Sequence, residues 1–179
     1  MWKNKYASDY YRMTGELYKA GIKTWIRRIT HHNINYMYWW RKNAENKTLL
    51  TKVMLYKMSR KYGIEIGNAQ IGEGLYIGHP YNITVNETAV LGKNINLHKG
   101  VTIGTENRGK RLGAPNIGDQ VFVGVNATIV GKITIGDDVL IAPNSYVNTD
   151  VPSHSIVIGN PARVYCSEMA TRNYINFIR

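Results

Sequence analysis

The sequence predicts a solenoid of short β-strands that follows a region of α-helices. A repeat of six residues in the second part of the chain and a change of composition before it lead to this prediction. A helix repeats every 3.6 residues and a strand every 2, so a strict period of six fits neither as one long element. Three hexads close one triangular coil, with an aliphatic side chain pointing inward on each face and a small residue near each corner. The aliphatic positions, which make about four coils, are Ile71, Ile77, Ile83, Leu91, Leu97, Ile103, Ile117, Val123, Ile129, Ile135, Ile141 and Val147.

Composition divides the chain at Gly63. Residues 1–62 contain 14 Lys and Arg against three acidic residues, whereas residues 63–179 contain nine of each sign. All four tryptophans lie before the boundary, and 15 of the 17 glycines lie from Gly63 to Gly159. We therefore expect a helical region over 1–62, a solenoid domain over 63–165 and a tail over 166–179.

The first region shows helical spacing of apolar residues. One helix is expected after a cap at Ser8 or Asp9, a second over 35–44, and a third from near Thr48 to Gly63 as its C′ residue. The first helix would present Tyr10, Thr14, Leu17, Tyr18, Ile22, Trp25, Ile26 and Ile29, and the third Leu50, Met54 and Met58. One interpretation is a cap over the open end of the solenoid. A compatible one is that residues 1–62 also contact an anionic membrane surface or a lipid-linked substrate.

Composition also bears on the compartment and on partners. The sequence has no apolar run of about twenty residues and no signal-peptide pattern. Its one cysteine, Cys166, agrees with a reducing cytoplasm. We expect a cytoplasmic protein, peripheral at the inner face of the membrane where the helical region touches it. We expect no nucleic-acid partner, because no recognition module is visible.

The repeat breaks twice. The step from Ile83 to Leu91 is eight residues, and the step from Ile103 to Ile117 is fourteen. The longer break holds the polar, glycine-rich segment 105–115, which we expect to protrude as a loop. Loops on rigid scaffolds often carry binding residues.

Two histidines of the solenoid occupy outward positions. His79 and His98 lie one coil apart, and neither falls on an inward position of its hexad. His79 lies between Gly78 and Pro80, directly before the first break. It is therefore the stronger candidate for chemistry.

Several motifs resemble the hexapeptide-repeat acyltransferases of the serine acetyltransferase type. They are Ile71-Gly72-x-Gly74-Leu75-x-Ile77-x-His79, Val85-x-Glu87-Thr88-Ala89-Val90, Gly100-Val101-Thr102-Ile103-Gly104 and Gly159-Asn160-Pro161-Ala162-Arg163-Val164. The resemblance covers about residues 63–165. It implies a left-handed parallel β-helix, a homotrimer, and acetyl-CoA bound in grooves between neighbouring chains.

The resemblance also implies roles for individual residues. His79 occupies the position of the family's catalytic histidine, and Glu65 aligns, across a one-residue gap, with the acid that orients it. His79 would take the proton from an acceptor hydroxyl as that oxygen attacks the thioester carbonyl. Gly104, Gly124 and Ala142 fit a groove for the pantetheine arm, although the corners of the fold also require small residues. Lys132 and Arg163 are candidates for the nucleotide end of the cofactor.

This sequence departs from the serine enzymes at the acceptor site. Their catalytic histidine follows an aspartate, where this chain has Gly78, and their Arg-His-Pro motif is replaced by Gly113-Ala114-Pro115. The loop is instead similar to loops of capsule and exopolysaccharide O-acetyltransferases. We therefore predict transfer to a sugar hydroxyl, free, nucleotide-linked or lipid-linked. Asn107, Arg108, Lys110 and Arg111 are candidates for binding the acceptor, or the phosphates of acetyl-CoA.

Four alternatives stay open at this point. They are a serine O-acetyltransferase, a nucleotide-sugar N-acetyltransferase, a non-catalytic trimeric scaffold and a metal-dependent hydratase of similar fold. The hydratase needs converging imidazoles, two of them about five residues apart, whereas His79 and His98 are nineteen apart. We therefore expect no metal.

Overall fold

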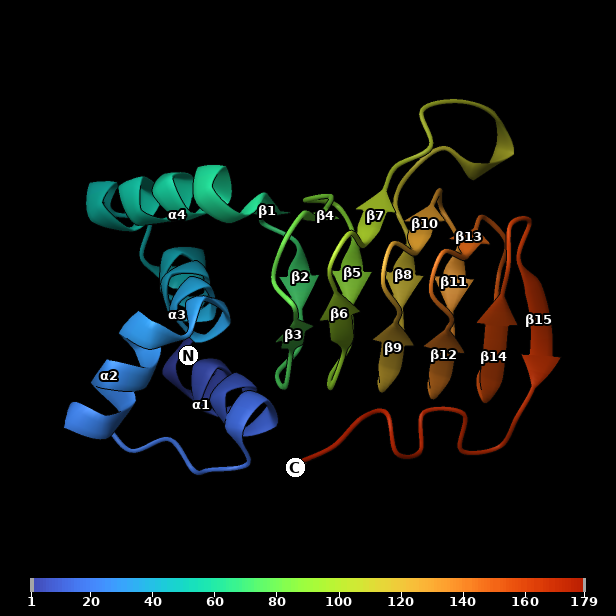
Figure 1. The fold of residues 1–179 in the computed structure, drawn as a ribbon. Helices are drawn as coiled ribbons and strands as arrows, with labels where there is room; N and C mark the ends of the chain where they lie inside the picture. The colour runs from blue at the N-terminus through green and yellow to red at the C-terminus, as the bar shows by residue number, and fades with distance from the viewer. Residues whose placement is uncertain (1, 179) are drawn as a thin grey trace.

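A computed structural model describes residues 2–178 of the chain (Figure 1). Four helices precede the strands: α1 (Trp2–Thr14), α2 (Ile22–Thr30), α3 (His32–Glu45) and α4 (Leu49–Tyr62). The strands form three sheets, which are the three faces of a prism. Sheet A contains β1 (Ile64–Ile66), β4 (Ile83–Val85), β7 (Thr102–Gly104), β10 (Thr128–Val130) and β13 (Tyr146–Val147). Sheet B contains β2 (Gln70–Ile71), β5 (Val90–Leu91), β8 (Asn116–Ile117) and β11 (Thr134–Ile135). Sheet C contains β3 (Tyr76–Gly78), β6 (Asn96–His98), β9 (Val121–Val123), β12 (Val139–Ile141), β14 (Ser155–Ile158) and β15 (Arg163–Cys166).

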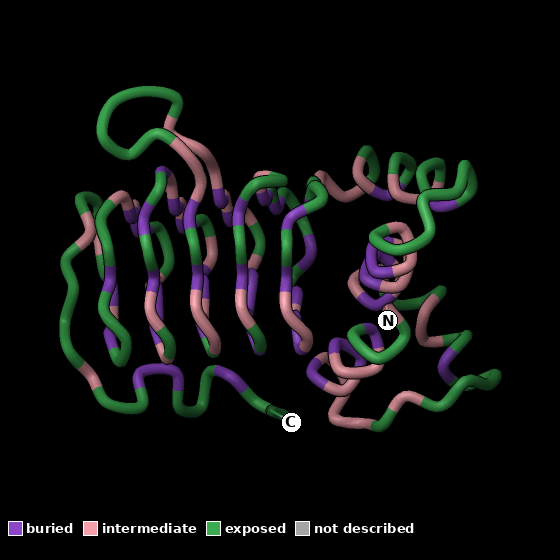
Figure 2. Tube along the Cα trace, turned by 180° about the vertical axis from the view of Figure 1, so that it is seen from behind, coloured by how far each residue is buried: buried purple, intermediate pink, exposed green. Residues whose placement is uncertain are grey.

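The predicted β-helix is confirmed. Strands of successive coils pair in parallel, and the aliphatic positions stack directly, as Ile77 does on Leu97 and Ile103 on Ile129. The residues at these positions are buried, and Figure 2 shows buried residues recurring along the strands from coil to coil. The solenoid has about five coils rather than four, because sheet A already begins with β1, upstream of the first repeat seen in the sequence.

The first register break lies at a different place from the one predicted. Val85, not Ile83, pairs with Ile103 of the next coil, and both Ile83 and Val85 are buried. The extra two residues therefore belong to the corner between β3 and β4, which holds His79. The second break forms the expected loop, which projects between β7 and β8 (Figure 1).

The first predicted helix is wrong in its bounds. It begins at Trp2 and ends at Thr14, and a separate helix, α2, starts at Ile22. Gly15 adopts a left-handed conformation with φ of 69° directly after α1, which ends the helix. Neither Ser8 nor Asp9 is a cap, because both lie inside α1. Asp9 is instead fully buried.

The other two helices agree with the sequence. α3 covers the predicted 35–44, with three more residues at its start and one more at its end. The side chain of Thr48 accepts a hydrogen bond from the Thr51 N–H and caps α4. Gly63 ends α4 with φ of 67°, as a C′ glycine does.

Polar contacts fix the helices to the first coil. Arg41 donates two hydrogen bonds to Asp9, at 2.7 and 3.0 Å, and a third to the carbonyl of Ile71 at 2.9 Å. Asp9 also accepts from the N–H of Leu75 at 2.8 Å. Burial acts to raise the pKa of Asp9, and Arg41 opposes that rise. The predicted cap is therefore formed, by α1 and α3.

The C-terminal segment returns along the solenoid. β15 pairs antiparallel with β14, and residues 167–178 then run back toward the helices beside sheet C (Figure 1). Asp138 anchors this tail by accepting hydrogen bonds from the backbone of Ala170 and from Thr171. Within residues 2–178 no helix has the length and apolarity that crossing a membrane requires.

Candidate active site

His79 lies at the enlarged corner between sheets C and A. Its backbone is left-handed, with φ of 50°, and its side chain is exposed. The corner is held by hydrogen bonds from Tyr81 N–H to the His79 carbonyl and from Asn82 N–H to the Tyr62 carbonyl. Because the wider corner carries the imidazole outward, His79 can reach a molecule bound along this edge of the prism.

His98 lies beside His79, one coil further on. The two ring centroids are 6.4 Å apart. Burial, and then the neighbouring His79, lower the pKa of His98, so its ring is neutral at physiological pH. Its buried Nε2 makes no hydrogen bond within the described chain. The sequence identified both histidines as outward but did not show that they meet.

The His98 ring explains the glycine at position 78. Gly78 pairs with His98 across the two coils. A Cβ atom at Gly78 would lie only 2.7 Å from the His98 ring and 2.9 Å from that of Tyr76. An aspartate at position 78 would therefore require His98 to move.

Glu65 lies on the first strand of sheet A. It is the exposed central residue of β1 on sheet A, where it pairs with Thr84 of β4. Among residues 2–178, no hydrogen bond or ion pair joins Glu65 to His79. Its role as the orienting acid stays a prediction.

The loop between β7 and β8 folds back on itself. Glu106 and Gly113 exchange two backbone hydrogen bonds of 3.0 Å, and a short 3-10 helix, η1 (Gly109–Arg111), forms the tip. The N–H of Lys132 donates to the carbonyl of Arg111 at 2.8 Å, so the loop rests on the next coil. The predicted binding side chains of Asn107, Arg108, Lys110 and Arg111 are all exposed.

The predicted site residues fall on two edges of the prism. His79, Gly124 and Ala142 lie at corners where the chain passes from sheet C to sheet A. The second group lies where it passes from sheet A to sheet B, and consists of Gly104, Asn107, Arg108, Lys110, Arg111 and Lys132. Arg163 is exposed on β15, at the far end of the solenoid. Sheet A therefore separates the general-base candidate from the basic loop of the same chain.

The glycines on the two edges are present for different reasons. A Cβ at Gly124 would lie 2.7 Å from the Pro143 nitrogen, so the corner itself requires glycine there. At Gly104 the nearest atom is Val130 Cγ1 at 3.4 Å, which leaves room for a methyl group. Packing alone therefore does not explain Gly104.

A cavity of about 220 Å³ lies beside His98. Tyr76, Phe122 and Tyr174 give it aromatic walls, and Arg12 and Asn96 give it polar ones. Asn96 donates to the Tyr174 carbonyl at 3.1 Å and accepts from Arg12. No local sequence pattern predicts this cavity, because α1 and the C-terminal tail reach it from opposite ends of the chain. No group of three metal-ligating side chains is present in the described part of the chain.

Known proteins resemble this chain in both sequence and structure. The family model described as bacterial transferase hexapeptide (six repeats) matches residues 114–149. Serine acetyltransferase 2 of Arabidopsis thaliana is 40% identical over 123 residues, which are 67% of this chain and 38% of that protein. Serine acetyltransferase of Staphylococcus epidermidis is 35% identical over 129 residues, covering 71% of this chain and 61% of that protein.

A solved structure extends the similarity to the helices. The serine acetyltransferase of Neisseria gonorrhoeae, in complex with serine, superposes with a TM-score of 0.68 at 31% identity, covering 92% of this chain and 69% of that chain. The chain spans only 38% and 61% of the two relatives named above. The repeat, the coil register and these similarities together show that the chain belongs to the hexapeptide-repeat acyltransferases, on the branch of the serine acetyltransferases.

Proposed function

We propose that this protein transfers an acetyl group from acetyl-CoA to an acceptor hydroxyl, with His79 as general base. The observation that carries the proposal is the exposed His79 on the enlarged corner of an acyltransferase scaffold. The imidazole takes the hydroxyl proton while the oxygen attacks the thioester carbonyl. The tetrahedral intermediate then expels the CoA thiolate, which takes up the proton. No metal takes part in these steps.

We further propose that the working unit is a homotrimer. His79 and the basic loop lie on different edges of one chain, so a site that uses both needs the loop of a neighbouring chain. The groove between two prisms would then hold acetyl-CoA along Gly104 of one chain and Gly124 and Ala142 of the next. Lys132 and Arg163 would meet its nucleotide end.

Serine is the acceptor that the relatives support. The matched relatives are named serine acetyltransferases, and one solved relative contains serine. The chain is therefore first to be tested as a serine O-acetyltransferase. The reducing cytoplasm, inferred from the lone Cys166, is the compartment we propose for either acceptor.

A sugar hydroxyl is the second candidate, and the surroundings of His98 favour it. The neutral ring of His98 fills the space that the side chain of an aspartate at position 78 would need. Position 78 therefore offers no negative charge to the ammonium group of serine. The adjoining cavity combines aromatic walls with the polar side chains of Arg12 and Asn96, a lining that suits both stacking on a sugar ring and hydrogen bonding to its hydroxyls. The exposed Asn107, Arg108, Lys110 and Arg111 would contact the acceptor or its phosphates.

The test is release of free thiol from acetyl-CoA with serine and with a panel of sugars, for the wild type and His79→Ala. We expect acceptor-dependent release that falls by about 10²-fold or more in the variant, the usual scale for loss of a general base. Equal release by both proteins would refute the role of His79. Absence of release together with absence of CoA binding would identify a scaffold instead.

A further inference from the structure

Helix α2 presents its apolar side to solvent. Ile22, Trp25, Ile26 and Ile29 follow the i, i+3, i+4, i+7 spacing of one helix face, and they are 78%, 54%, 46% and 54% exposed. The one buried residue of α2 is Thr24, on the opposite side. A surface helix ordinarily turns its apolar stripe toward the core. The apolar stripe of α2 therefore faces solvent, and its polar side faces the rest of the protein.

Polar contacts hold α2 in that orientation. Arg27 donates to Glu16 at 2.8 Å and to the hydroxyl of Tyr10 at 3.2 Å. The guanidinium of Arg28 lies 4.1 Å above the ring of Tyr38. These contacts fix the polar side of α2 against the other helices, so the apolar side stays outward.

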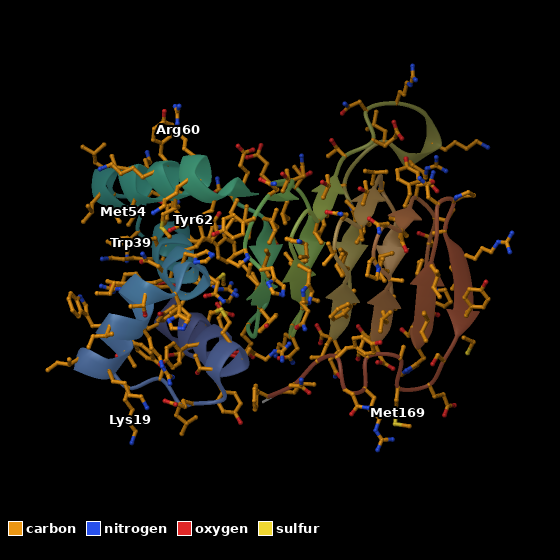
Figure 3. The ribbon with its side chains drawn as sticks, viewed as in Figure 1. Lys19, Trp39, Met54, Arg60, Tyr62 and Met169 are labelled. Atoms are coloured by element: carbon orange, nitrogen blue, oxygen red, sulfur yellow. The ribbon has the colours of Figure 1, made fainter. Side chains whose placement is uncertain are left out.

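The charge of the surrounding region indicates what covers this face. Residues 1–62 hold 14 Lys and Arg against Asp9, Glu16 and Glu45, which is a net charge of +11. A second copy of the same face would bring an equal positive charge against it. An anionic surface is complementary instead. Lys19 and Lys23 are exposed at the start of α2. Lys23 pairs with Glu16 at 2.8 Å, whereas Lys19 projects away from the molecule (Figure 3).

We propose that α2 docks the protein on an anionic lipid bilayer, with Ile22, Trp25, Ile26 and Ile29 at the boundary between headgroups and acyl chains. A short amphipathic helix with basic flanks and a tryptophan on its apolar face suits that position. α2 lies at the end of the molecule away from the solenoid (Figure 1). The solenoid, with His79, would then project from the bilayer. The inference is independent of the acceptor and of the acetyl transfer.

The test is co-sedimentation of the full chain with vesicles of phosphatidylcholine alone and of phosphatidylcholine with phosphatidylglycerol. The variant Trp25→Ser/Ile29→Ser removes half of the apolar face. The matched control, Leu49→Ser/Tyr56→Ser, removes two side chains of α4 that are 78% and 60% exposed. We expect binding to the anionic vesicles only, weakened by salt, and a loss of at least ~10-fold in the α2 variant but not in the control.

Three results would overturn the proposal. Equal binding by the wild type and the α2 variant would remove α2 from the contact. Equal binding to both kinds of vesicle would remove the need for anionic lipid. A smaller assembly of the α2 variant in lipid-free sedimentation velocity would show that a second copy covers this face. Circular dichroism checks that both variants keep their helices.

Discussion

The solenoid and the helical region of this molecule bury their interiors by different means. In the solenoid, one aliphatic side chain per hexad stacks on its counterpart in the next coil, and Ile77, Leu97 and Ile103 are 0% exposed. In the helical region the interior is aromatic and ionic, with Tyr6, Tyr10, Asp9 and Arg41 almost fully buried. The first interior repeats along the sequence, whereas the second joins residues that are far apart in it.

This difference has an energetic consequence. Each coil of a solenoid contacts only its neighbours, so damage in one coil stays local. The helical region depends on one buried ion pair, which joins α1, α3 and the first coil at once. We therefore expect the helical region to be the more easily broken of the two.

The largest effect is expected from Arg41→Met. The change leaves Asp9 buried without its partner, which costs about 3–5 kcal/mol. All four tryptophans lie in the helical region, so tryptophan fluorescence reports on its unfolding. In urea, this transition should come before the loss of the β-strand signal of the solenoid in circular dichroism. The double variant Asp9→Leu/Arg41→Met should recover much of the loss, because an apolar pair needs no charge compensation. A single unchanged transition in Arg41→Met would contradict this account.

A core cavity in the solenoid should cost less. Ile103→Ala removes a side chain packed between Val85 and Ile129, with an expected loss of about 2–5 kcal/mol. The matched control is Thr102→Ala on the neighbouring, outward position, with a change within about 0.5 kcal/mol. Thermal unfolding followed by circular dichroism measures both. If Thr102→Ala cost as much as Ile103→Ala, the inward direction of the repeat would be wrong.

A smaller loss is expected from Gly78→Ala. The added methyl meets the His98 ring, and such overpacking costs about 1–3 kcal/mol. Adding His98→Ala should relieve most of that cost. A double-mutant cycle, measured by urea denaturation, gives the interaction free energy between positions 78 and 98. Additive losses would show that His98 does not occupy this space.

With serine as acceptor, Gly78→Asp/His98→Ala should release thiol faster than Gly78→Asp alone.

The smallest effect concerns the tail and its pH dependence. Burial acts to raise the pKa of Asp138, but hydrogen bonds from Thr171, His154 and Ala170 outweigh it and hold the pKa below the ordinary value. The stabilisation is therefore present above the usual carboxyl pKa of about 3.9 and is lost as the pH falls through the lower folded value. Asp138→Asn should cost about 1 kcal/mol and free the tail already at pH 7. Proteolysis at Arg172 measures this release, and equal cleavage of both proteins at pH 7 would count against the anchor.

The repeat made most of the solenoid predictable, because a period of six has one structural solution. The position of the first break was not predictable, because both Ile83 and Val85 point inward. Only the pairing of Val85 with Ile103 shows which of the two continues the repeat. The helix boundary at Gly15 was missed because Leu17 and Tyr18 continue the apolar spacing through a loop. His79 was singled out by its neighbours Gly78 and Pro80, and its catalytic role, which the family resemblance implies, stays a prediction.

Other parts of the site depend on contacts that no local pattern reports. The overlap of His98 with the space at Gly78 follows from the pairing of the two coils and from the rotamer of His98, and the second of these has no signature in the sequence. The cavity beside His98 combines Arg12 of α1 with Tyr174 of the tail. The division of the site residues between two edges follows from the order of the sheets.

The most direct test of the central claim, a site shared between chains, is a subunit-mixing assay. One partner carries His79→Ala, and the other carries Lys110→Glu/Arg111→Glu in the loop. Each alone should release little thiol, whereas co-expressed chains should recover about a quarter of the wild-type rate, because one site in four then has both an intact histidine and an intact loop. A mixture no more active than its two parents would contradict the shared site.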